Sequence, residues 1–358
     1  MKKTVLVLLL LLIQSFAFAQ ILDKKIDSLL ANVFTDTNGP GGVFMITKSG
    51  KPIYQKAFGK ANIELNVDMQ TANVFQLGSI TKQFTAIAIL MLEEEGRLSV
   101  NDPISTFITD YPNGNHITIH QLLNHTSGVK DFTKMKALNQ MAQQNLSPKE
   151  LVDFFKNESV DFQPGEKFEY NNSGYAILGY IIELVAKETY ENFIQKNIFE
   201  KAAMKHSRYA NDVAVIPNRA YGYQKKSEQY VNKTRISFNV PYASGSLMST
   251  LDDMLKWQNA LNQNLLLKSS SIKKAFTKSK LNNGEVVNYG YGWHLLNINE
   301  IPTREHGGSI FGFKTMGVYF PNQDIYILGL SNCDCNSPTQ VTRDIAKLVI
   351  QTIRNEKL

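Results

Sequence analysis

A hydroxyl and an amine three residues apart suggest nucleophilic chemistry at one point of the chain. Ser79 and Lys82 open residues 78–91, whose later positions are mostly apolar and include neither Pro nor Gly. This composition predicts a buried helix that begins near Ser79 and ends at Gly96. Side chains three apart share one helix face, so the amine can accept the proton of the hydroxyl. The positive potential of the helix N-terminus favours a neutral amine and stabilises an oxyanion.

The Ser-x-x-Lys spacing alone is not specific, because it occurs four times, starting at Ser79, Ser127, Ser270 and Ser271. Ser127 lies in a turn-like segment, and the last two lie in a basic segment typical of a solvated surface. Only Ser79 precedes a buried helix. The competing interpretation of Ser79 is a plain N-cap followed by an exposed Lys82, and the local sequence by itself favours it. The catalytic interpretation therefore depends on the rest of the chain.

Two further short patterns carry polar groups. Tyr170-x-Asn172 follows a Pro-Gly turn at residues 164–165 and directly precedes an apolar helical pattern. The same Tyr-x-Asn spacing occurs elsewhere in the chain, so this setting is what distinguishes it. His306-x-Gly308 is the only His-x-Gly of the sequence. Its glycines allow a close approach of the backbone to a ligand.

Composition and the first residues define the class of protein. The 358 residues are 43% hydrophobic and 20% charged, which is ordinary for a globular protein and gives ample length for a large core. Residues 1–19 combine a basic start, an apolar run at 5–13 and a small-x-small site before Gln20, which predicts a secretory signal peptide. An uncleaved anchor is the alternative. It is disfavoured because nine apolar residues are too few to span a bilayer comfortably.

Charge, cysteine and histidine spacing give no support for a nucleic-acid or metal site. Removing residues 1–19 takes away two lysines and no acid, lowering the formal net charge from +6 to +4, and no Lys/Arg block remains. Cys333 and Cys335 are expected to be loop thiols, with a strained disulfide as the less favoured alternative. His116 and His120 are four apart, but they flank a β-favouring stretch with no carboxylate to complete a metal site. His125 is expected to satisfy a turn. We expect neither a metal nor a cofactor.

The order of elements predicts an α+β fold. Strands at 43–47 and 53–58 form a hairpin after an N-terminal helix at 21–33, and strands at 289–297, 315–320 and 325–330 precede a last helix. Helices fill the middle. This order predicts an antiparallel sheet built from the N- and C-terminal segments, flanked by helices and carrying an inserted helical subdomain. The expected single domain at 20–358 divides into a sheet subdomain at about 20–75 and 240–358 and a helical subdomain at about 76–239.

Taken together, these patterns resemble the β-lactamase and D-alanyl-D-alanine peptidase superfamily of serine hydrolases. The branch with class C β-lactamases and their peptidase and esterase relatives is the most similar. Three motifs occur in the family's order: Ser79-x-x-Lys82, Tyr170-x-Asn172 and, in place of Lys-Thr-Gly, His306-x-Gly308. The flanking stretches at 122–128, 243–250 and 291–293 are similar too. The resemblance covers nearly the whole mature chain and implies a β-lactamase/transpeptidase-like fold.

The resemblance also implies a division of roles. Ser79 Oγ attacks a carbonyl and forms an acyl-enzyme, while Lys82, with a depressed pKa, helps to take its proton. Tyr170 acts with Lys82 as general base and later activates water or another acceptor. Asn172 hydrogen-bonds Lys82 or the substrate amide. The backbone N–H groups of Ser79 and Ser309 form the oxyanion hole.

The substrate class follows less directly from the resemblance. A D-alanyl-D-alanine carboxypeptidase-like activity on a small-molecule or cell-wall peptide substrate is our first expectation. A β-lactamase or an esterase is the alternative within the family, and a non-catalytic peptidoglycan-fragment binder is the alternative of another class. His306 replaces a Lys that holds the substrate carboxylate in lactam-hydrolysing relatives, so we expect protonated His306 to carry any preference for carboxylates. The expected location is periplasmic or secreted, with no stable membrane span after signal removal and no nucleic-acid partner.

Overall fold

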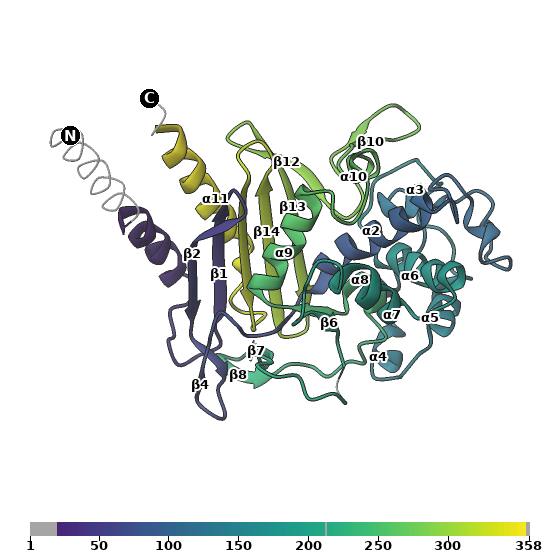
Figure 1. Ribbon diagram of the computed structural model, residues 1–358. Helices are drawn as coiled ribbons and strands as arrows, with labels where there is room; N and C mark the ends of the chain where they lie inside the picture. Colours follow the sequence, from purple (N-terminus) through teal and green to yellow (C-terminus); the bar gives the residue numbers. More distant parts are fainter. Residues whose placement is uncertain (1–19, 212, 356–358) are drawn as a thin grey trace.

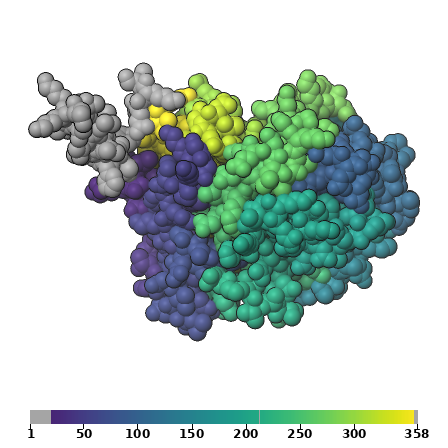
Figure 2. All heavy atoms as spheres, viewed as in Figure 1, coloured from purple at the N-terminus to yellow at the C-terminus, as the bar shows by residue number. Residues whose placement is uncertain are grey.

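The structure of the chain is a computed structural model that describes residues 20–211 and 213–355. The predicted signal peptide at 1–19 lies outside these residues. Within them, no helix has the length and apolar character needed to cross a membrane. Figure 2 shows green parts of the chain packed directly against the purple N-terminal and yellow C-terminal parts.

One antiparallel sheet joins the two ends of the chain (Figure 1). Its strands are β1 (Gly42–Lys48), β2 (Lys51–Phe58), β12 (His294–Ile298), β13 (Ile301–Ile310), β14 (Phe313–Phe320) and β15 (Ile325–Ser331). The order across the sheet is β12-β13-β14-β15-β1-β2. β1 pairs with β15, so that Gly42 lies opposite Ser331. This pairing confirms the predicted α+β fold with an antiparallel sheet built from both terminal segments.

The remaining elements are mostly helices and short strand pairs. The longer helices are α2 (Thr81–Glu94), α6 (Asn172–Ala186), α9 (Leu251–Asn262) and α11 (Pro338–Asn355), and residues 20–31 are also helical. Shorter helices are α3 (Ile119–Leu123), α4 (Leu138–Met141), α5 (Pro148–Phe155), α7 (Tyr190–Ile194), α8 (Tyr242–Gly245) and α10 (Ser269–Ala275), with a 3-10 turn η1 (Gly78–Ile80) before α2. Short strands are β3 (Lys60–Asn62), β4 (Val67–Asp68), β5 (Phe75–Gln76), β6 (Arg208–Tyr209), β7 (Tyr223–Lys226), β8 (Gln229–Asn232), β9 (Leu247–Ser249), β10 (Ser279–Lys280) and β11 (Val286–Val287).

Alternating side chains of the sheet face two different hydrophobic cores. On β1, Val43 and Met45 join the larger core, which the sheet shares with α2, α6 and α9. Phe44 and Ile46 point the other way and pack with α11 and helix 20–31 in a second core. This is the two-residue period of a strand buried on both faces. The sheet thus carries α11 on one face and α9 on the other (Figure 1).

Helix α2 lies at the centre of the larger core. Every residue from Thr81 to Leu92 is buried, and α6, α8 and α10 pack against it. The helix ends at Glu94, and Gly96 follows with a φ of 68°, so the predicted glycine stop is confirmed. A buried helix held on several sides is a rigid support for the groups at its N-terminus.

Several details of the predicted C-terminal third are wrong. The strand expected at 289–297 begins only at His294, because Gly292 has a φ of 85° and packs against the backbone of α2. Strand β13, which carries the His-x-Gly pattern, was not predicted at all. Cys333 and Cys335 form a disulfide rather than remaining thiols, since the turn between them brings their Cα atoms to 5.1 Å.

Candidate active site

Ser79 lies at the wall of a cavity and next to a buried amine. It occupies η1, directly before α2, and lines a cavity of about 510 Å³ together with Tyr170, Asn172 and Ser309. Lys82 lies in the first turn of α2 with none of its surface exposed, and its Nζ is 3.2 Å from Ser79 Oγ. The N-cap interpretation with an exposed lysine is therefore wrong. The three-residue spacing places the two groups within hydrogen-bond distance.

The oxygen atoms that contact Lys82 Nζ belong to neutral groups, not to carboxylates. Its Nζ lies 2.8 Å from Asn172 Oδ1 and 3.0 Å from the carbonyl oxygen of Ser244. Burial lowers the pKa of Lys82 to about 7, and the carboxylate of Asp131 opposes the shift. A neutral amine has two N–H donors and one lone pair, so it can donate to Asn172 and Ser244 while its lone pair faces Ser79. This is the arrangement of a general base beside a nucleophile.

The amide orientation of Asn172 is determined by its other contacts. Its Nδ2 lies 3.3 Å from Asp131 Oδ2 and 3.2 Å from Thr133 Oγ1, both of which accept hydrogen bonds. The Oδ1 atom is therefore the one that faces Lys82. The predicted contact between Asn172 and Lys82 is present. Asp131 and Thr133 behind it were not identified from the sequence, because no motif of the three includes them.

Tyr170 presents a buried hydroxyl beside the same pair. Among the described residues, no group meets hydrogen-bond geometry with this hydroxyl, although Ser79 is close enough to lower its pKa. Burial has the larger effect and raises the pKa of Tyr170 well above that of a free phenol. Lys82 Nζ lies 4.8 Å from the centre of the Tyr170 ring. At neutral pH Tyr170 is thus a neutral phenol, not a phenolate.

His306 cannot serve as the cation expected from the sequence. Its side chain on β13 is only 2% exposed, with Nε2 at 3.1 Å from Tyr289 Oη and Nδ1 at 2.6 Å from Gly307 O. Burial, together with neighbouring His294 and Lys82, holds the pKa of His306 well below its usual value. The hypothesis that protonated His306 selects carboxylates is wrong, because burial and the neighbouring groups keep the ring neutral at neutral pH.

The glycines of this region bring the protein's own backbone together. A Cβ on Gly308 would lie 2.0 Å from the carbonyl oxygen of Leu77, and a Cβ on Gly78 would lie 2.8 Å from Ser309 N. Gly78 also has a φ of 55°, which other residues rarely adopt. These two glycines let η1 contact β13 directly, so Ser79 and Ser309 become neighbours. The backbone that Gly308 approaches here is that of Leu77.

Two further residues near the site have contacts that the sequence patterns did not reveal. Lys314 on β14 lies opposite Ser309 in the sheet register, and its Nζ donates a hydrogen bond to Ser309 Oγ at 2.8 Å. His125 was expected to satisfy a turn, and it does have a φ of 63°. Its ring also packs 4.4 Å from that of Tyr170, between the centroids, which supports the phenol from behind. Pairing register and ring packing are tertiary features that no local pattern reports.

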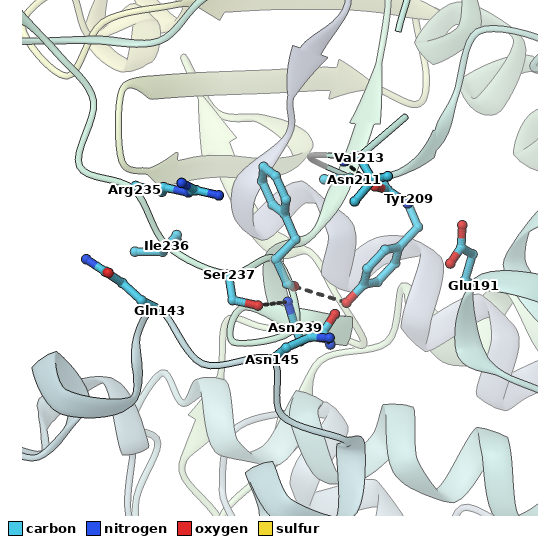
Figure 3. Close-up of a pocket in the computed structure, with 12 residues that line it drawn as sticks. Gln143, Asn145, Glu191, Tyr209, Asn211, Val213, Arg235, Ile236, Ser237 and Asn239 are labelled. Atoms are coloured by element: carbon cyan, nitrogen blue, oxygen red, sulfur yellow. Dashed lines mark hydrogen bonds between the residues drawn. The ribbon is translucent and has the colours of Figure 1, made fainter. Parts of the chain in front are cut away.

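A larger cavity of about 630 Å³ lies beside the first and shares Ile236 with it (Figure 3). Figure 3 shows Glu191 and Tyr209 on one side and Arg235 on the other. The Tyr209 hydroxyl donates to the carbonyl oxygen of Phe238 at 3.0 Å, so it serves the fold. The described residues that line this cavity include no Lys, His or Cys. The larger cavity therefore has no counterpart of the Ser79–Lys82 pair that borders the smaller one.

Comparison with known proteins agrees with this geometry. The β-lactamase family model matches residues 22–351. A penicillin-binding protein of Bacillus subtilis (strain 168) is 32% identical over 306 residues, which cover 81% of this chain and 68% of that protein. The octameric penicillin-binding protein homologue from Pyrococcus abyssi has a TM-score of 0.80 at 29% identity, covering 92% of this chain and 77% of that one.

One further structure shows likeness of fold alone. The D-amino acid amidase from Ochrobactrum anthropi SV3 has a TM-score of 0.80 at 22% identity, and the match covers 94% of this chain and 99% of that one. The family model spans nearly all the described residues, and the sheet, the central helix and the cavity occupy that span. The chain thus belongs to the β-lactamase family of penicillin-binding-protein-like serine hydrolases.

Proposed function

We propose that this protein cleaves a D-alanyl peptide through an acyl-enzyme on Ser79, in the manner of a D-alanyl-D-alanine carboxypeptidase. The observation that carries the proposal is the 3.2 Å approach of Ser79 Oγ to a fully buried lysine whose pKa is lowered to about 7. About half of such an amine is neutral at pH 7, against roughly one part in 10³ for an ordinary lysine of pKa about 10.4. The pair can therefore deprotonate a serine at neutral pH.

Acylation begins when Ser79 Oγ attacks the substrate carbonyl and its proton passes to Lys82 Nζ. Asn172 Oδ1 and Ser244 O hold the amine in place, so its lone pair stays directed at the serine. The tetrahedral intermediate then loses the amine of the leaving group, and that nitrogen receives the proton from Lys82 through the neutral phenol of Tyr170. In deacylation, water attacks the ester carbon and the same groups return the proton to Ser79 Oγ. The high pKa of Tyr170 supports Lys82 as the base and the phenol as a relay in this proposal.

The oxyanion is assigned to two backbone donors. We propose the N–H groups of Ser79 and Ser309, because the close contact of η1 with β13 places these residues side by side. One such donor is typically worth about 3–4 kcal/mol of transition-state stabilisation. The proposal explains why glycines occupy positions 78 and 308, where a side chain would separate the two segments.

The carboxylate of a C-terminal D-alanine requires a cation that His306 does not supply. We propose Lys314, whose Nζ already lies at 2.8 Å from Ser309 Oγ. Changing Lys314 to Ala should raise KM about tenfold for a peptide with a free C-terminal carboxylate, since a charge-assisted hydrogen bond is lost. The C-terminal amide of the same peptide should be affected less than twofold. Steady-state kinetics on the two peptides measure this, and an equal change in KM for both would rule out Lys314 as the carboxylate contact.

Labelling of the serine tests the hydrolase assignment. Fluorescent penicillin and a fluorophosphonate should label the wild type and not Ser79→Ala. Ser270→Ala is the matched control, because Ser270 begins another Ser-x-x-Lys pattern on the exposed side of α10 and should label normally. Release of D-alanine from a D-Ala-D-Ala peptide, compared with an ester and a lactam, then separates the peptidase from its alternatives. Absence of labelling in the wild type would favour the non-catalytic peptidoglycan binder.

Export is the remaining element of the proposal. The basic start, apolar run and small-x-small site of residues 1–19 support a signal peptide that is removed before Gln20. The disulfide between Cys333 and Cys335 is consistent with an oxidising compartment. Intact-mass measurement of the protein from the cell exterior or periplasm should give a chain that begins at Gln20. A chain retaining residues 1–19 would contradict this part of the proposal.

A further inference from the structure

One carboxylate faces the cavity that holds Ser79. Among the described residues that line this cavity, Asp334 alone carries a charge, and the others are apolar or neutral polar side chains. Lys82 is buried behind the wall, and Lys314 lies beside Ser309 without lining the space. Asp334 thus places a negative charge at one point of the cavity wall, where a cationic group of a ligand would be attracted, while Lys314 places a positive charge beside Ser309.

Asp334 is held in place by its neighbours. It lies between Cys333 and Cys335, so the disulfide closes a small turn around it. Its backbone N–H donates to the carbonyl oxygen of Tyr223 at 3.2 Å. Its Oδ1 accepts a hydrogen bond from Gly312 N at 3.0 Å, at the end of the β13–β14 hairpin. Its Oδ2 accepts one from Gln224 Nε2 at 2.9 Å. The carboxylate is thus fixed before any ligand arrives, which lowers the cost of binding.

The carboxylate keeps the capacity to bind more. Two hydrogen bonds use about half of the lone-pair sites of an ionised carboxylate. Within the described part of the chain, no Lys, Arg or His forms an ion pair with Asp334, and its side chain is partly exposed. A ligand ammonium group would add a charge-assisted hydrogen bond that the protein itself does not provide. Nearby Ile236 and Phe311, the latter 41% exposed, offer apolar contact to the hydrocarbon part of such a ligand.

A purely structural role for Asp334 would need no negative charge. Asparagine can accept the same hydrogen bond from Gly312 N through its Oδ1 and so keep the turn attached to the hairpin. The change Asp334→Asn therefore removes the charge and the hydrogen bond from Gln224 Nε2, and it keeps the size of the side chain and the contact with Gly312 N. A structural role predicts no change in ligand preference, whereas a binding role predicts the loss of a preference for cations.

We infer that Asp334 determines specificity by binding an ammonium group of the substrate, so that the favoured D-alanyl peptides carry a primary amine. The inference rests on the proposed function for the chemistry at Ser79, and it adds the chemical class of the substrate. Lys314 near Ser309 and Asp334 near the hairpin end place opposite charges at two points of one site. A substrate with an anionic end and a cationic side group matches this arrangement.

Matched peptides test the inference in the full-length mature protein. Nα-acetyl-lysyl-D-alanyl-D-alanine has a free side-chain amine, and the Nα,Nε-diacetyl peptide has the same backbone without the charge. The wild type should favour the free amine by about tenfold in kcat/KM, as expected for one charge-assisted hydrogen bond. Asp334→Asn should reduce that ratio to near one. Asp344→Asn, the same change at a half-exposed residue of α11 that pairs with Lys347, should keep it.

A binding measurement separates failure of this inference from failure of the proposed function. Calorimetry should show that the wild type binds benzylamine about tenfold more tightly than benzyl alcohol, and that Asp334→Asn loses this preference. If neither peptide is cleaved but the amine preference remains, the proposed function fails and the role of Asp334 stands. If the peptides are cleaved at one rate by the wild type, or if the wild type shows no preference for the amine over the alcohol, the inference is overturned.

Discussion

Replacing Lys82 with methionine is expected to lower kcat/KM by about 10³-fold, because the reaction loses its general base. Methionine has a similar length and no proton acceptor, so Ser79 keeps its position while its hydroxyl has no base to take the proton. Acylation should slow by the same factor as turnover, since the amine acts in both half-reactions. Stopped-flow or quenched labelling with a fluorophosphonate measures the acylation step directly.

Lys273→Met is the matched control for this change. Lys273 is the lysine of the Ser270-x-x-Lys pattern, and its side chain is exposed on α10. The Lys273→Met variant should keep the wild-type acylation rate. Thermal unfolding of the Lys82 variant should show that it is folded, since removing a buried amine also removes an unfavourable desolvation. Retention of more than about a tenth of the wild-type acylation rate by the Lys82 variant would exclude the amine as the base, given the ~10²–10⁴-fold contribution of general bases.

Replacing Gly308 with alanine is expected to destabilise the protein by about 3 kcal/mol and to abolish most activity, because overpacking of this kind forces the backbone to move. The added Cβ would lie 2.0 Å from the carbonyl oxygen of Leu77 and 2.3 Å from Thr315 Oγ1. Because the Leu77 carbonyl belongs to the backbone, it cannot rotate away from the added Cβ as a flexible side chain could. Strand β13 must therefore separate from η1, which moves Ser309 N away from Ser79.

Gly307→Ala is the matched control in the same strand. Its added Cβ would meet only Met316 Sδ and the carbonyl oxygen of Thr315, both at 3.4 Å, which is an ordinary contact distance. Chemical denaturation and acylation rates of the two variants make the comparison. Near-equal stability and rate of the two alanine variants would show that close packing of η1 on β13 is not what positions the site.

Much of the fold could be predicted from local patterns, and the main pair at the site could be predicted from its spacing together with the order of the other motifs along the chain. Alternating and helical hydrophobic periods reveal which segments are strands and which are helices, and strands at both chain ends imply a shared sheet. The proximity of Ser79 and Lys82 follows from their spacing on one helical turn, and the structure places them 3.2 Å apart. Burial of Lys82 was required by the chemistry, and it is present.

The residues that were missed depend on tertiary contacts. Strand β13 was overlooked because its adjacent glycines have low strand propensity, and only pairing with β12 and β14 stabilises it. The burial of His306 follows from packing of Tyr289 against β13, which no local pattern reports. Asp334 and Lys314 reach the site through the turn at the disulfide and the register of a hairpin. Neither feature can be read from neighbouring residues.

The pH dependence of acylation reports on Lys82 as the base, because the neutral fraction of this amine controls the rate. With the pKa of Lys82 lowered to about 7, the amine is protonated below that pH and neutral above it, so the acylation rate should rise through pH 7 and level off by about pH 8.5. The pKa values of His125 and His306 are held well below the usual value of a histidine, and the pKa of Tyr170 is raised above that of a free phenol. None of the three groups should therefore change the acylation rate between pH 6 and 9. We therefore expect the acylation rate of the wild type to rise once, through pH 7, and to show no other change between pH 6 and 9. A rate that is flat from pH 6 to 9, or that rises only toward pH 10 as for an ordinary lysine, would contradict it.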